Sequence, residues 1–264
     1  MVLLLTGAID IRNFNIPSTK ITDCKERLDQ YLDSIDYALT HYQSISDLVF
    51  CENTNFNFDY SYLHEKAVQY GKKLEILSFK GDYIRIQQNG KGYGEGEIIA
   101  YALNNSKLLS KSESFFKLTG RLVVKNMDQI ITSSPLSSYF IYHPKNIYKV
   151  SKDHIETFFY KSEKKLYLNL LMNAYKEVDE LRFQYLEHIF YERLYPIKLK
   201  SFKLRPEISG LSGTAGDNYG SGNKNKMLEI IFHSIGVNHL TKTRYQNLLT
   251  KFLSLLLKII RWVK

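Results

Sequence analysis

Residues 1–10 read MVLLLTGAID, and the predicted fold builds outward from this stretch. The unbroken apolar run Val2–Leu5 is typical of a strand buried on both faces. It is far shorter than the roughly 18 apolar residues of a membrane span, and no basic segment precedes it, so we do not expect a signal peptide. The strand is expected to end at Thr6-Gly7, which places a hydroxyl and a small residue at its carboxyl end.

Apolar runs and helical patterns alternate through the first half of the chain. Apolar residues recur at helical spacing over residues 20–43, at positions Leu28, Leu32, Ile35 and Leu39. Further strands are expected at 47–51 and 74–79, and further helices at 61–72 and 95–109. This alternation predicts an α/β fold with a mostly parallel central sheet flanked by helices.

Ligands bind such sheets beyond the carboxyl ends of the strands. The polar pair Glu52-Asn53 ends the second predicted strand, as Thr6-Gly7 ends the first. We therefore expect both pairs and the loop over residues 80–94 to lie on one rim and to bind a ligand.

The second half of the sequence is less regular. Residues 115–125 predict a strand, a turn and a strand, and short strands are expected near 140–142 and 156–160. Helices are expected over about 163–180 and 182–194, and another from about residue 241. We expect one domain over residues 1–240, followed by a C-terminal helix over 241–264.

Composition limits the kinds of ligand and cofactor that this protein is expected to bind. The formal net charge of +9 over 264 residues favours anionic ligands or surfaces. The two cysteines, Cys24 and Cys51, have no metal-binding or redox spacing, which favours a reducing compartment without a disulfide framework. The histidines are scattered and no Asp-x-Asp triplet occurs, so no pattern in the sequence indicates a metal cofactor.

Residues 90–97 read GKGYGEGE, between a predicted strand and a predicted helix. Backbone amides near Gly92 and the Lys91 ammonium suit a phosphate, although the stretch matches neither the P-loop nor the dinucleotide pattern. Glu95 and Glu97 would repel phosphate, and they suit sugar hydroxyls or acid–base catalysis. Alternatively, the stretch is a turn followed by acidic residues that favour a helix N-terminus.

The stretch FFKLTGR at residues 115–121 carries two cations near a Thr-Gly turn. Lys117, Thr119 and Arg121 would share one face of a strand, so both cations could contact one diphosphate. The alternative is a solvated hairpin with surface cations.

A second glycine-rich stretch, SGLSGTAGDNY at residues 209–219, could surround anionic oxygens with amides and hydroxyls. Its candidate ligand-binding residues are Ser212, Gly213, Thr214 and Tyr219. A disordered linker is the alternative, because Gly and Ser dominate.

Glu187 lies in the helical stretch Tyr185-Leu-Glu-His188 among aromatic residues. An apolar setting raises the pKa of a carboxyl group and suits a general base. The alternative is an exposed glutamate beside an ordinary histidine.

The C-terminal helix combines a basic stripe with an apolar side. Residues 242–264 contain six basic residues and no acidic one, and Trp262 lies near the end. Such a helix is typical of in-plane binding to an anionic membrane surface. Packing against the protein's own core is the alternative.

Taken in order, these stretches resemble a group of bacterial glycosyltransferases from capsule and O-antigen gene clusters. The resemblance rests on LLLTGAID, VFCENT, GKGYGEGEIIAYAL, FFKLTGRLVVKN, ETFFYKSEKKLY, YLEHIFYERL and PEISGLSGTAGDNY, within residues 2–220. It implies a GT-A-like domain that transfers a sugar from a UDP-linked donor, with UDP-galactofuranose one candidate. In that fold an acidic triplet usually holds a metal on the diphosphate, whereas the corresponding region here contains Lys117 and Arg121.

The resemblance implies that Thr6, Gly7, Glu52 and Asn53 hold the donor nucleotide and that Glu187 acts as the base. The expected partners are a nucleotide-sugar donor, a lipid-linked saccharide acceptor and an anionic membrane surface, with no nucleic acid. The expected location is the cytoplasm, at the inner face of the cell membrane. The alternatives are a nucleic-acid-binding protein and a non-enzymatic membrane-associated protein, since both would use the positive charge.

Overall fold

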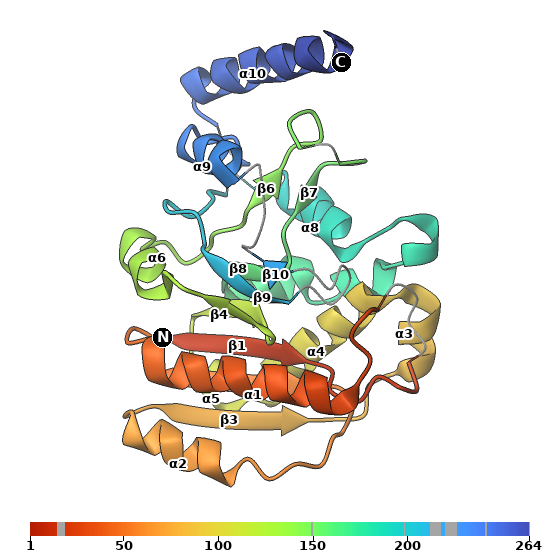
Figure 1. Ribbon diagram of the computed structural model, residues 1–264, viewed down its shortest axis with the longest axis vertical. Helices are drawn as coiled ribbons and strands as arrows, with labels where there is room; N and C mark the ends of the chain where they lie inside the picture. The colour runs from red at the N-terminus through yellow and green to blue at the C-terminus, as the bar shows by residue number, and fades with distance from the viewer. Residues whose placement is uncertain are drawn as a thin grey trace.

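The computed structural model describes residues 1–14, 19–148, 150–197, 199–211, 218–219, 226–240 and 242–263. Its main sheet has the strand order β3-β2-β1-β4-β8. The parallel strands are β1 (Val2–Gly7), β2 (Asp47–Glu52), β3 (Lys73–Ser78) and β4 (Ser114–Thr119), and β8 (Phe159–Glu163) runs antiparallel to β4. The expected mostly parallel sheet flanked by helices is confirmed (Figure 1).

Residues that alternate along β1 pack on opposite faces of the sheet, as the two-residue period of a strand requires. Leu3 and Leu5 belong to the core that faces α1 (Cys24–His41) and α2 (Ser61–Gln69). Leu4 belongs to the core that faces α4 (Lys91–Asn105) and α8 (Leu186–Leu194). Burial on both faces explains why the sequence of β1 is continuously apolar.

The glycine-rich stretch GKGYGEGE is helical from Lys91 onward, so the predicted loop over residues 80–94 is wrong. Helix α4 begins at Lys91 rather than Glu95. A Cβ atom on Gly96 would overlap the Cβ of Tyr175, and one on Gly92 would lie 3.1 Å from Leu186 Cβ. Glycine therefore lets η2 (Ala174–Glu177, a 3₁₀ turn) and α8 pack closely against α4.

Further helices differ from the sequence prediction: the first lies in the predicted loop over 80–94, the second is separate from the helix predicted over 95–109, and the third lies where no element was predicted. They are α3 (Tyr83–Asn89), α5 (Lys107–Ser110) and α9 (Lys226–Ser234). The helix expected over residues 163–180 is instead a series of short turns: α7 (Lys164–Leu166), the π turn η1 (Tyr167–Leu171), and η2. The 3₁₀ turn η3 (Glu180–Arg182) follows and ends at Phe183, which has a φ of 59°.

The strand–turn–strand predicted for residues 115–125 exists, but its strands belong to different sheets. β4 lies in the main sheet, whereas β5 (Leu122–Val124) pairs with β9 (Ile208–Leu211), which in turn pairs with β10 (Asn218–Tyr219). Helix α6 (Met127–Ser133) follows β5. A separate two-stranded ladder joins β6 (Tyr142–His143) to β7 (His154–Ile155).

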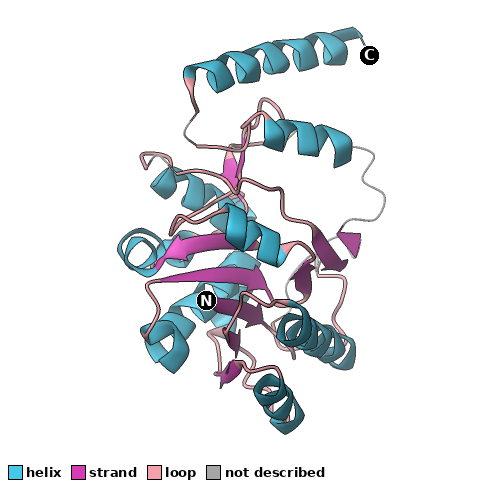
Figure 2. Cartoon of the chain, turned by 90° about the vertical axis from the view of Figure 1, so that its left-hand side faces the viewer, coloured by secondary structure: helices cyan, strands magenta, loops and turns pink. Residues whose placement is uncertain are grey.

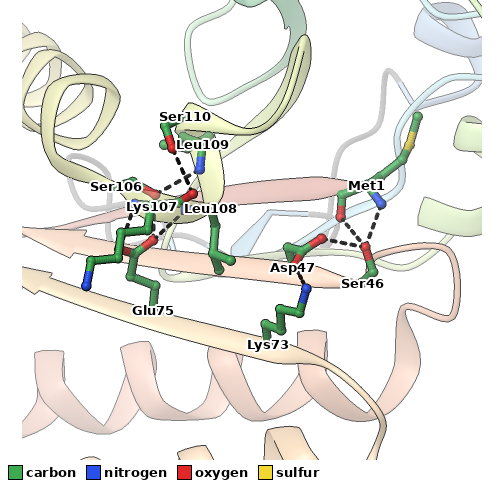
Figure 3. A network of polar contacts seen from close by, with 10 residues as sticks. All are labelled: Met1, Ser46, Asp47, Lys73, Glu75, Ser106, Lys107, Leu108, Leu109 and Ser110. Carbon is green, nitrogen blue, oxygen red and sulfur yellow. Dashed lines mark hydrogen bonds and ion pairs between the residues drawn. The ribbon is translucent and has the colours of Figure 1, made fainter.

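Polar contacts hold the sheet near the amino ends of its strands (Figure 3). Glu75 of β3 accepts hydrogen bonds from the Ser106 hydroxyl at 2.6 Å and from the backbone N–H of Lys107 and Leu108 at 2.9 and 3.0 Å. The Met1 amino group donates to the Ser46 hydroxyl at 2.8 Å. These contacts fix α5 and the start of β1 at the edge opposite the carboxyl ends of the strands.

Helix α10 (Arg244–Val263) lies at one end of the molecule, with α9 between it and the main sheet (Figures 1 and 2). Leu253 and Leu257 pack against a small core that contains Ile147, Phe232 and Val237. Within the described part of the chain, no helix is both long and apolar enough to cross a membrane.

Candidate functional site

A cleft of about 680 Å³ opens beyond the carboxyl ends of β1 and β4. One wall comes from the segment after β1 and from the first turns of α4, and it includes Thr6, Gly7 and Gly92. The lining also includes Thr157, just before β8, and Glu187 of α8. The cleft thus occupies the edge of a parallel sheet where ligands bind.

Two α1 side chains hold the segment that follows β1. The Arg27 guanidinium donates to the carbonyl oxygen of Ala8 at 2.8 and 2.5 Å and to that of Ile21 at 3.0 Å. The Tyr31 hydroxyl accepts the Ala8 N–H at 2.9 Å. These bonds fix the floor of the cleft, and the sequence analysis did not single out either side chain.

Among the residues that the structure describes, three cationic side chains line the cleft: Arg27, Lys91 and Arg121. Arg121 donates to Gln30 Oε1 at 3.1 Å, and its guanidinium lies 5.9 Å from the centre of the Tyr31 ring. Burial lowers the pKa of Lys91, while the charges of Glu180 and Glu187 oppose that shift. The charge of Arg121 adds to the lowering, so Lys91 lies within electrostatic reach of Arg121, Glu180 and Glu187.

A carboxylate occupies the N-terminus of α4, where the sequence suggested a phosphate. Glu180 of η3 accepts the Gly92 N–H at 2.8 Å and lies against Gly90, where a Cβ atom would overlap it. This contact supplies the negative charge that a helix N-terminus favours. Sequence analysis missed Glu180 because it lies far from Gly92 along the chain.

Lys117 and Glu95 form an ion pair beneath the cleft. Glu95 lines the cleft and accepts the Thr6 hydroxyl at 2.9 Å. The Lys117 side chain is fully buried, and it also donates to Thr157 O at 2.8 Å and Thr119 Oγ1 at 3.1 Å. The ammonium predicted to contact diphosphate is thus bound to a carboxylate, whereas Thr119 and Arg121 line the cleft.

Glu187, the residue predicted to act as a base, lines the cleft, and its role stays a prediction. Its Oε1 accepts the Thr157 hydroxyl at 2.6 Å. Burial raises the pKa of Glu187; the Thr157 hydrogen bond opposes this shift, and the charges of Glu156 and Glu180 reinforce it. A carboxylate with a raised pKa is a stronger proton acceptor near neutral pH.

Two of the predicted site residues point elsewhere. Glu52 is fully buried, and its carboxylate accepts the Thr54 N–H at 2.7 Å and the Phe56 N–H at 2.9 Å, so it orders the loop after β2. Glu97 accepts the Asp82 N–H at 3.0 Å, and burial raises its pKa. Neither lines the described cleft.

Asn53 lines the cleft with its side chain buried. Its amide lies near enough to Glu97 to lower the pKa of that carboxyl group. Within the described residues, neither amide atom makes a hydrogen bond of good geometry. A buried amide with unused donors and an acceptor on a cleft wall suits a polar ligand.

Ser212, Gly213 and Thr214 lie outside the described residues, so their predicted role stays a prediction. The backbone of Tyr219 pairs with Gly210 in the β9–β10 ladder. Leu211, at the end of β9, lines the cleft, so this ladder reaches the site.

The turn after β4, Thr119-Gly120-Arg121, carries no carboxylate. These residues therefore do not fit the diphosphate-bound metal that the GT-A-like resemblance places in this region.

Two histidines and a glutamate, His143, His154 and Glu156, come together beside the cleft. Burial lowers the pKa of His143 to about 4. Burial alone would raise the pKa of Glu156, but the interactions of its carboxylate with His143 and His154 are stronger, and they lower the pKa of Glu156 below its usual value.

No family model matches the sequence, and no curated protein matches it. Among solved structures, a Bacillus anthracis protein provisionally described as a glucose-1-phosphate thymidylyltransferase is 9% identical, with a TM-score of 0.46 over 93% of this chain and 98% of that chain. A nucleoside-diphosphate-sugar pyrophosphorylase from Vibrio cholerae RC9 is 14% identical, with a TM-score of 0.38 over 73% and 86%. HddC from Yersinia pseudotuberculosis is 14% identical, with a TM-score of 0.30 over 62% and 76%. Similarity at this level supports no statement about activity.

Proposed function

We propose that this protein is a glycosyltransferase that moves a sugar from a nucleotide-sugar donor to an acceptor hydroxyl. The observation that carries the proposal is that Arg27, Arg121 and the Glu187 carboxylate line the same cleft. Transfer from a sugar nucleotide needs both features, because a diphosphate leaves while a hydroxyl loses its proton.

The donor diphosphate is expected beside Arg121 and Lys91. Arginine can hold phosphate oxygens through two parallel N–H bonds, and lysine adds a point charge. As the acceptor oxygen bonds to the anomeric carbon, the bond from that carbon to the diphosphate oxygen breaks. The electron pair leaves on the diphosphate, where the cations stabilise it.

Glu187 is the carboxylate assigned to accept the proton of the acceptor hydroxyl. Glu95 also lines the cleft, but its carboxylate is already paired with the ammonium of the buried Lys117. Glu97 faces the turn at Asp82 instead of the cleft. Glu187 is held by a neutral hydroxyl, and the raised pKa that burial gives it suits a base.

The proposal includes a UDP-linked donor, with UDP-galactofuranose one candidate, and a role in bacterial surface-glycan synthesis. These features come from the resemblance of the ordered sequence stretches. Asn53 and the Thr6–Ala8 segment are the proposed nucleotide-side contacts, because they lie at the carboxyl ends of β1 and β2.

The proposed acceptor is carried on a lipid, and α10 supplies the supporting observation. The side chains of one face of α10 are exposed and apolar: Tyr245, Leu248, Phe252, Leu255 and Leu256. Basic residues adjoin this face, among them the exposed Lys251, whereas Leu253 and Leu257 pack inward. An apolar stripe flanked by cations fits the surface of an anionic bilayer, at the inner face of the cell membrane.

A donor screen tests the proposal. Purified protein is incubated with a panel of nucleotide sugars, and free nucleotide diphosphate is measured as the product of donor hydrolysis or transfer. Arg121→Ala should lower this release strongly, while the exposed Arg85→Ala should match wild type. Release from none of the donors, together with no thermal shift by any nucleoside diphosphate, would overturn the proposal.

A further inference from the structure

A hairpin brings together three side chains that are scattered in the sequence. His143 of β6 pairs directly with His154 of β7 in antiparallel register. Glu156 lies two residues after His154, so both side chains project from the same face, and its N–H is fixed by Ile141 O at 2.9 Å. The three side chains are partly buried, with 21%, 16% and 19% of their side-chain surfaces exposed.

The potential ligand atoms of these side chains all lie within 4.8 Å of one another. His143 Nδ1 is 3.4 Å and His154 Nε2 is 3.9 Å from Glu156 Oε1. Two ligand atoms of a tetrahedral zinc site, with bonds of about 2.0–2.1 Å, lie about 3.3 Å apart. The first spacing matches this value, and the second is about 0.6 Å longer.

Neighbouring groups hold the two imidazoles in place. The His143 ring stacks on Tyr148, with ring centres 4.2 Å apart, and Asn238 Nδ2 donates to the Tyr148 hydroxyl at 2.9 Å. His154 Nδ1 lies 3.4 Å from Lys152 O. A backbone carbonyl at Nδ1 leaves Nε2 as the ligating nitrogen. Histidines that bind metals commonly donate their other ring N–H to such a carbonyl.

We propose that His143, His154 and Glu156 bind a divalent first-row transition metal ion. Two imidazoles and one carboxylate suit Zn²⁺, Mn²⁺ or Co²⁺ better than Mg²⁺ or Ca²⁺, which prefer oxygen ligands. Three protein ligands leave at least one coordination position for water or substrate. Glu156 and the adjacent Thr157 both line the cleft, so the proposed ion would lie at the margin of the cleft that contains Glu187.

The metal site is proposed independently of glycosyl transfer, and its test reads metal binding alone. Chelator-treated protein is titrated with ZnCl₂ by calorimetry and with CoCl₂ by visible absorption. We expect one ion per chain and a cobalt spectrum with a histidine nitrogen environment. Glu156→Gln and His143→Ala should each weaken Zn²⁺ binding by at least about 100-fold.

His64→Ala, which removes an exposed histidine of α2, is the matched control and should bind like wild type. Glu156→Gln keeps the shape of the side chain, so it tests the site even where a histidine variant fails to fold. Failure of wild type to bind either ion at millimolar concentration would overturn the proposal. Unchanged binding in a folded Glu156→Gln variant would do the same, because the ion would then not be held by the proposed three-residue site.

Discussion

The buried ion pair between Lys117 and Glu95 predicts an asymmetric response to mutation. Glu95→Gln leaves the Lys117 ammonium buried, with the neutral Thr119 hydroxyl and Thr157 carbonyl as acceptors. Breaking a buried pair in this way costs about 3–5 kcal/mol. Because folded domains are stable by only about 5–15 kcal/mol, this single change should remove a large share of the stability.

Lys117→Met should cost less. The Glu95 side chain is 23% exposed, so water can reach the carboxylate, and the Thr6 hydroxyl still donates to it. We expect a loss of about 1–3 kcal/mol, typical of a hydrogen-bonded group that loses one partner. The double variant Lys117→Met/Glu95→Gln removes both charges and should be less destabilised than the sum of the two single changes.

The assay is urea unfolding followed by far-ultraviolet circular dichroism, with all variants at one pH and ionic strength. Glu65→Gln, an exposed change on α2, is the control and should lie within about 0.5 kcal/mol of wild type. A loss below about 1 kcal/mol for Glu95→Gln would refute the ion-pair reasoning. Additivity of the two single changes in the double variant would refute it as well.

Three further results are expected. Gly96→Ala should lose about 1–3 kcal/mol in urea unfolding because the new methyl overlaps Tyr175, whereas Gly94→Ala, 3.3 Å from Ile86, should lose less than Gly96→Ala. Burial raises the pKa of Glu187, so the contribution of this group to stability is present at low pH and is lost as the pH rises through the folded-state pKa. The melting temperature of Glu187→Gln minus that of wild type should therefore increase from about pH 4 to about pH 8. A difference that stays constant with pH would contradict this. Phe252→Asp should reduce sedimentation with anionic vesicles, and equal sedimentation of wild type and variant would mean that α10 does not bind the bilayer.

Local periodicity was enough to predict the first three strands of the main sheet. The apolar runs at β1, β2 and β3 are short and separated by helical patterns, so each strand could be placed from its own residues. The carboxyl-end rule then placed Thr6, Gly7 and Asn53 at the cleft, where the structure has them.

The stretch GKGYGEGE could not be placed in this way. Its glycines suggested a loop because isolated glycine weakens a helix, but packing against Tyr175 outweighs that preference. Tyr175 is distant in the sequence, so no local pattern records the contact. The same holds for Glu180, which occupies the helix N-terminus that was expected to bind phosphate.

Contacts between residues far apart in the sequence could not be predicted either. Lys117 was predicted to face a diphosphate because strand periodicity put it beside Thr119, and that part of the reasoning is confirmed by their hydrogen bond. Its partner Glu95 comes from α4, which periodicity cannot place against β4. His143 and His154 likewise meet only through the β6–β7 register.

The most direct test of the proposed transfer is the turnover of Glu187→Gln, measured together with its donor affinity. Wild type and variant are compared for sugar transfer to a lipid-linked acceptor and for donor binding by calorimetry. We expect kcat to fall by at least about 100-fold with the donor Kd little changed, because the amide keeps the shape of the side chain but accepts no proton. Turnover at the wild-type rate would contradict the assignment of Glu187 as the base.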